Sequence, residues 1–176
     1  LRTFAVTDSD ECPPVGAPPY STSTTSAFYG QALVVYGTTG DAGASLTTDQ
    51  TAIANFWADN AGATGTPGGH WISIVHVLAT ANDLKLDVVA EAYARVGLAI
   101  HDAFITCWRS KFDTYLLRPV TYIQANIDAA WDPLLTTPGF PTYTSGHSTQ
   151  SGAAATVLTG QFGPVAFTDT THTDLN

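Results

Sequence analysis

Two short segments of the sequence carry side chains that could bind an oxyanion. The first, residues 111–119 ("KFDTYLLRP"), places Lys111 and Arg118 seven residues apart. On one continuous helix this spacing equals about two turns, or roughly 10 Å along the axis, so both side chains would share a face. Lysine offers a point charge and arginine a planar fork of donors. The pair predicts a place for one anion, although a solvated helix face is the alternative reading of this segment alone.

The second segment, residues 140–152 ("FPTYTSGHSTQSG"), contains Ser145, Gly146 and His147 in succession. Ser145 is a typical N-cap residue, so the three residues are predicted at a helix N-terminus, where free N–H groups and the helix dipole favour an anion. Gly146 allows close approach of the backbone, and His147 can exchange a proton near neutral pH. The segment therefore predicts an oxyanion site with an acid–base group, and a simple turn is its alternative reading.

The elements that must position these residues are predicted to be helices. Thr47 is a predicted N-cap with Gln50 as its capping-box partner, and residues 70–81 form an apolar helix. A long helix should start at Asp83 or Asp87 and run to about Leu117, because a residue before a proline leaves the α region. A short helix or turn follows at 120–127. The last helix should run from Ser145 to Gly160 or Gly163. No hairpin or repeat is visible, so the fold class is all-α, a helical bundle.

The N-terminal part of the chain differs in composition from the rest. Residues 1–24 are rich in Pro, Ser and Thr and are predicted to form an extended arm, whereas residues 26–37 are apolar and fit either a strand or a short buried helix. The predicted domain organisation is an irregular arm with a short apolar segment over 1–46 and a helical oxyanion-binding domain, incomplete at its C-terminus, over 47–176.

Charge and composition narrow the function further. The chain has 176 residues, a net charge of −9 and only six Lys plus Arg, three of which lie between residues 109 and 118. This balance argues against nucleic acid or an anionic membrane as partner, and no apolar run is long enough to span a bilayer. The acidic composition, rich in Thr, Ser, Gly and Ala, suits a secreted or periplasmic protein. Two cysteines, Cys12 and Cys107, leave open whether a disulfide joins them.

Taken together and in this order, the two segments resemble a known family. A Lys-x6-Arg-Pro element followed by Ser-Gly-His resembles the first two of three signature motifs of the vanadium-dependent haloperoxidases and of the related acid phosphatases of the type 2 phosphatidic-acid-phosphatase superfamily. Thr144 stands where the family usually has proline. Trp108 and Phe140 stand where haloperoxidases carry aromatic residues that line the oxyanion pocket. The resemblance covers about residues 47–160.

The resemblance implies a cofactor, substrates and residue roles. Lys111 and Arg118 would neutralise the oxygens of bound vanadate, while Ser145 and Gly146 would donate hydrogen bonds to it. His147 would be the acid–base residue, and Lys111 would help to activate hydrogen peroxide, which then oxidises a halide. Phosphate would fit the same site, so a phosphomonoesterase is one alternative and a non-catalytic structural or assembly protein is another. Family bundles often pair, which predicts a homo-oligomer.

The third family motif, Ser-Arg-x5-His-x3-Asp, is not found in the sequence. If His172 were its histidine, Val165 and Ala166 would replace the serine and the arginine, and Asn176 would replace the aspartate. We therefore predict no direct vanadium-ligand histidine in this chain, and we expect a truncated chain with a companion chain or segment that carries the motif. Of the other histidines, His70 is expected to cap a loop or pack on Trp71, and His76 to be a core histidine.

Overall fold

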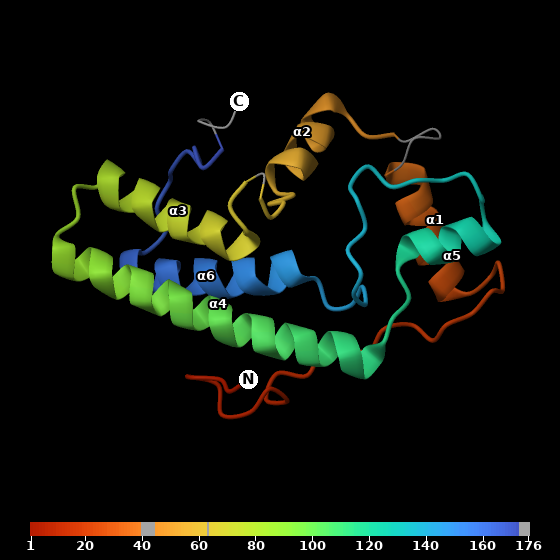
Figure 1. The fold of residues 1–176 in the computed structure, drawn as a ribbon, viewed down its shortest axis with the longest axis horizontal. Helices are drawn as coiled ribbons and strands as arrows, with labels where there is room; N and C mark the ends of the chain where they lie inside the picture. Colours follow the sequence, from red (N-terminus) through yellow and green to blue (C-terminus); the bar gives the residue numbers. More distant parts are fainter. Residues whose placement is uncertain (40–44, 63, 173–176) are drawn as a thin grey trace. The chain divides into compact units, whose positions relative to one another are not determined.

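The computed structural model describes residues 1–39, 45–62 and 64–172, which form six helices and no strand. This result confirms the predicted all-α class (Figure 1). The helices are α1 (Ala27–Thr38), α2 (Thr48–Phe56), α3 (Pro67–Ala81), α4 (Leu86–Thr114), α5 (Pro119–Asn126) and α6 (Gly146–Phe162).

The chain divides into two compact units. The first contains Leu1–Pro13, Phe56–Arg109 and Thr144–Asn176, and the second contains Pro14–Asn55 and Ser110–Tyr143. The long helix α4 therefore contributes most of its length to the first unit and its last turns to the second.

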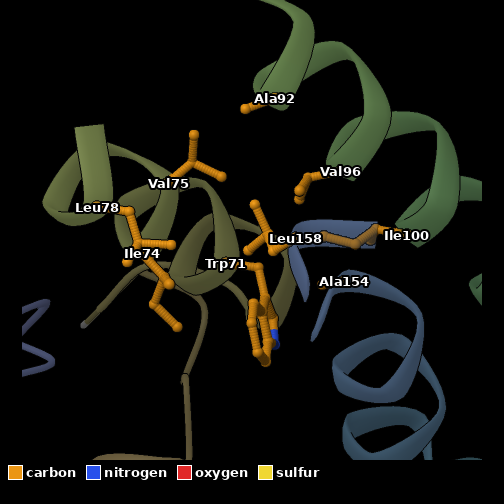
Figure 2. Close-up of a cluster of buried hydrophobic side chains, with 9 residues drawn as sticks. All are labelled: Trp71, Ile74, Val75, Leu78, Ala92, Val96, Ile100, Ala154 and Leu158. Carbon is orange, nitrogen blue, oxygen red and sulfur yellow. The ribbon is translucent and has the colours of Figure 1, made fainter. Parts of the chain in front are cut away.

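In the first unit, α3, α4 and α6 lie side by side around one apolar core (Figures 1 and 2). Helical spacing of apolar residues produces this core, because every third or fourth position of each helix faces inward. Ala154 of α6 is fully buried, and its small side chain lets α6 approach its neighbours closely. Burial of each large apolar side chain contributes roughly 1.5–3 kcal/mol. The core consists of Trp71, Ile74, Val75, Leu78, Ala92, Val96, Ile100, Ala154 and Leu158.

In the second unit, α1 packs against α5, and Phe28 and Ala32 meet Tyr122, Ile123 and Trp131 in a smaller core. The apolar segment at 26–37 is thus a helix, one of the two structures that its composition allowed. The buried Tyr122 satisfies its hydroxyl by donating to the backbone oxygen of Ser21 at 2.6 Å.

Side-chain caps fix several helix starts where the sequence predicts them. Thr47 and Gln50 form the reciprocal capping box, with Thr47 N–H donating to Gln50 Oε1 at 2.9 Å and Gln50 N–H donating to Thr47 Oγ1 at 3.2 Å. Ser145 Oγ accepts from the Ser148 N–H at 3.2 Å, so Ser145 is the N-cap of α6. This helix ends before Gly163, whose φ of 74° is easily adopted by glycine.

The end of α4 differs from the prediction, which placed it near Leu117. The helix ends at Thr114 because Tyr115 has a left-handed φ of 48° while its N–H still donates to Lys111 O at 3.0 Å. Arg118 is extended, as its position before Pro119 requires, and begins α5. Lys111 and Arg118 therefore do not share one helix face, and the two-turn argument for their convergence is wrong.

Residues 1–26 contain no helix or strand. In the first unit, the N–H groups of Phe4, Ala5 and Val6 donate to the carboxylate of the buried Asp102 at 2.7–3.0 Å. Cys12 is exposed and Cys107 is buried, and both are free thiols. Among the described residues, no helix combines the length and apolar character needed to cross a membrane.

Candidate active site

The first group of predicted site residues lies in the second unit, around the ring of Phe140. Lys111 is only 1% exposed, and its Nζ donates to the backbone oxygens of Pro141 at 2.9 Å and Thr142 at 3.2 Å. Arg118 Nε donates to the backbone oxygen of Phe140. Both cations also face the Phe140 ring, with Lys111 Nζ 5.0 Å and Arg118 Cζ 4.6 Å from its centroid. The loop before α6, rather than a shared helix face, therefore brings the two cations together.

Arg118 carries a donor that the protein itself does not use. Its side chain is half-buried, and its Nη2 atom is buried without a hydrogen-bond partner. Burial lowers the pKa of the Arg118 guanidinium from its ordinary value, although a guanidinium remains charged in proteins. A buried, charged donor without a partner costs free energy unless an acceptor compensates it. An oxyanion beside Arg118 would supply that acceptor.

The second group lies in the first unit, at the N-terminus of α6. Gly146 and His147 occupy the first turn, where backbone N–H groups have no partner within the helix. Gly146 packs tightly on Trp108, because a Cβ at this position would lie 3.3 Å from Trp108 Cζ3. Ser145 Oγ is occupied as an acceptor by the Ser148 N–H, which leaves its own hydrogen to donate.

His147 is about half-exposed and has a buried carboxylate beside it. Its side chain is 45% exposed, and its Nε2 lies 3.6 Å from Oδ2 of Asp59, whose side chain is fully buried. A carboxylate this close to an imidazole can orient the ring. The sequence analysis did not identify Asp59, since the two residues are far apart in the chain and no motif joins them.

Asp59 also belongs to a cluster of histidines and aspartates in the first unit that the sequence analysis missed. Its Oδ1 lies 2.8 Å from His70 Nδ1 and 3.1 Å from His172 Nε2. The other ring nitrogen of His70, Nε2, lies 2.8 Å from Asp169 Oδ2. Instead of packing on Trp71, the His70 ring stacks on Trp57 with centroids 4.1 Å apart and planes at 12°.

Asp169 and His76 are two further polar residues of the first unit. Burial raises the pKa of Asp169, but hydrogen bonds from Thr171 and His70 outweigh it and hold the pKa below its usual value. His76, expected in the core, is exposed on α3, because it lies on the face opposite to Ile74, Val75 and Leu78.

The comparisons with known proteins show what the chain is similar to. The fold defines a helical bundle, and residues 91–175 match the family described as the VCPO second helical-bundle domain. A solved structure described as the first bacterial vanadium-dependent iodoperoxidase is 37% identical and has a TM-score of 0.91, over 99% of this chain and 43% of that one. None of the curated proteins searched is significantly similar in sequence. The chain is similar to the iodoperoxidase over nearly its whole length, and it spans less than half the length of that protein.

Proposed function

We propose that this chain provides the vanadate-binding residues and the acid–base histidine of a haloperoxidase. The observation that carries the proposal is the unpartnered, buried Nη2 of Arg118 beside the buried Lys111. The buried Nη2 of Arg118 needs an acceptor, and a small multivalent oxyanion has the right sign and acceptor number.

The residues of both groups fit vanadate. Lys111 and Arg118 would balance its negative charge, and Ser145 and Gly146 would donate hydrogen bonds from the start of α6. Resemblance of the two motifs to those of the haloperoxidases is the reason for assigning both groups to one anion. Phosphate has the same shape and charge and would compete for these residues.

Vanadate, when bound, would supply a Lewis acid that activates hydrogen peroxide toward a halide. The protein's own contribution is to move protons and to exclude water. His147 is open to solvent at 45% exposure and can take a proton from a reactant or return it, and Asp59 Oδ2 lies 3.6 Å from its Nε2. Trp108 and Phe140 supply apolar surface, which strengthens the electrostatic interactions of the charged groups. Lys111 supplies a fixed positive charge.

We infer that halide oxidation also needs a segment that carries the third family motif. The 176 residues contain no Ser-Arg pair, which that motif requires. The matched region is 43% of the iodoperoxidase, so that protein is long enough to contain such a segment outside the match. A homo-oligomer and a secreted or periplasmic location stay part of this proposal.

The experiment is vanadate-dependent oxidation of iodide and bromide by peroxide, measured with the chain combined with a segment that carries the third motif and corrected for free vanadate. Activity that disappears in Lys111→Ala and His147→Ala but persists in Lys85→Ala, a change of an exposed lysine, supports the proposal. Full activity in either site variant would refute the assignment of these residues.

Two other results would favour the alternative functions. Hydrolysis of p-nitrophenyl phosphate that vanadate inhibits would indicate a phosphomonoesterase built on the same residues. A folded chain that shows neither activity and does not bind vanadate would indicate a structural or assembly protein.

A further inference from the structure

The histidine–aspartate cluster of the first unit has the donor set of a metal site. Asp59 Oδ1, His70 Nδ1 and His172 Nε2 are buried and lie within 4.8 Å of one another. Tetrahedral zinc with bonds of about 2.0–2.2 Å separates its ligand atoms by roughly 3.3 Å. The observed separations of 2.8 and 3.1 Å to Asp59 Oδ1 would need to widen by only a few tenths of an ångström.

The contacts of His70 are compatible with a cation at the cluster. Both of its ring nitrogens face carboxylate oxygens at 2.8 Å, from Asp59 on one side and Asp169 on the other. A neutral imidazole has only one N–H, so it can donate to only one of them. If Nε2–H donates to Asp169, the lone pair of Nδ1 faces the Asp59 oxygen, and either a second proton or a metal ion bound by both atoms makes this contact favourable.

In this arrangement, Asp169 accepts a hydrogen bond from His70 and would not itself bind the metal. Metal-binding histidines commonly donate their second N–H to a carboxylate, which fixes the tautomer and turns the other nitrogen toward the metal. Asp169 is itself held by the Thr171 hydroxyl at 2.6 Å and by the Thr171 N–H at 3.0 Å. Asp169 is therefore a positioning residue for His70.

The backbone of Asp59 also marks this place in the fold. Asp59 has a left-handed φ of 50°, a conformation that non-glycine residues seldom adopt and that is seen more often where function requires it. Its Oδ1 faces both histidines, whereas its Oδ2 lies 3.6 Å from His147 Nε2.

The surroundings hold the rings in place and keep water away. Phe56 packs its edge on both imidazoles, with centroids 5.3 Å from His70 and 5.0 Å from His172, and Trp57 stacks on His70. An apolar shell of this kind orients ligands and controls solvent access at metal sites.

We propose that Asp59, His70 and His172 bind a divalent transition-metal ion of the zinc class. Two imidazole nitrogens and one carboxylate oxygen suit such ions, whereas magnesium and calcium prefer oxygen ligands. The three ligands do not include Lys111 or Arg118, although Asp59 also lies 3.6 Å from His147, and the test requires neither vanadate nor enzymatic activity.

The test is a titration of the untagged 176-residue chain, stripped with a chelator, with Zn²⁺ by calorimetry and with Co²⁺ by visible absorption. We expect one Zn²⁺ per chain and Co²⁺ bands of low-symmetry nitrogen and oxygen coordination, with no saturable binding of Mg²⁺. His172→Gln should raise the Kd for Zn²⁺ at least about 100-fold, and Asp169→Asn about 10- to 100-fold. His76→Gln, which changes an exposed histidine, should leave the Kd unchanged.

Circular dichroism of each metal-free variant checks that it is folded. If His172→Gln does not fold, Asp169→Asn and the Co²⁺ spectrum of the parent chain decide the question. Absence of one-to-one Zn²⁺ binding by the folded parent chain would overturn the proposal, as would equal affinity in Asp169→Asn and the parent. Those results would assign the cluster to protonated histidines hydrogen-bonded to aspartates.

Discussion

Replacing Arg118 by lysine keeps the positive charge but removes the planar set of donors. The structure gives two consequences. The hydrogen bond from Nε to the Phe140 backbone oxygen is lost, and so is the buried Nη2 donor that has no protein partner. A hydrogen bond to a charged group contributes about 1.5–3 kcal/mol. If Nη2 donates to bound vanadate, its loss should weaken binding about 10- to 100-fold, since 1.4 kcal/mol corresponds to a factor of ten.

The assay is calorimetric titration with vanadate, repeated in the presence of phosphate as competitor. Arg95→Lys is the matched control, because Arg95 is about half-exposed and forms an ion pair with Glu91 on the same helix. We expect the Arg95→Lys variant to bind as the parent does. Equal vanadate affinity in Arg118→Lys and the parent, with both folded, would refute the reasoning that the guanidinium binds the anion.

Three further predictions concern stability. Phe140→Leu removes the ring that faces Lys111 at 5.0 Å and Arg118 at 4.6 Å. The free energy of unfolding in urea should fall by about 1 kcal/mol. An unchanged midpoint of the urea unfolding curve would contradict the cation–π contacts. Burial raises the pKa of Asp102, but hydrogen bonds from the N–H groups of residues 4–6 and from His101 outweigh it and hold the pKa well below its usual value. A lowered folded-state pKa stabilises the protein above an unfolded pKa of about 3.9, and this contribution is lost as pH falls toward the folded value. Asp102→Asn should therefore lower the free energy of unfolding by about 2 kcal/mol at neutral pH and make it less dependent on pH in acid. Amide hydrogen exchange at residues 4–6 should become faster, and unchanged exchange would contradict the hydrogen bonds to Asp102. Thr47→Ala removes the capping box and should lower the free energy of unfolding by about 1 kcal/mol, measured by thermal unfolding. An unchanged melting temperature would argue against that cap.

Local sequence signals were sufficient for the starts of α2, α5 and α6. Ser145 and the Thr47–Gln50 pair act through backbone groups only three residues away, so their chemistry is visible in the sequence. Pro119 likewise acts on its immediate neighbour, Arg118. Such short-range effects do not depend on the rest of the fold.

The end of α4 could not be predicted in the same way. Nothing in the side chain of Tyr115 requires a left-handed φ, which non-glycine residues seldom adopt. The turn is linked to the packing of the following loop, in which the Thr142 N–H donates to the Leu116 backbone oxygen at 3.1 Å. Lys111 and Arg118 meet at Phe140 through this loop, so their proximity is a tertiary effect.

The histidine–aspartate cluster could not be predicted from the sequence for a related reason. Asp59 and His172 are 113 positions apart, and His70 and Asp169 are 99 apart. No spacing rule connects such residues, and only the folded first unit brings them together. His172 does not fit the vanadium-ligand motif in the sequence, and in the structure it lies beside Asp59.

The most direct test of the account is vanadate binding by the 176-residue chain, followed by vanadium-51 NMR at increasing protein concentration. The account predicts one bound vanadate per chain, displaced by phosphate, and loss of the bound signal in the Lys111→Ala/Arg118→Ala double variant but not in Lys85→Ala. A folded parent chain that leaves the free vanadate signal unchanged would contradict the central claim.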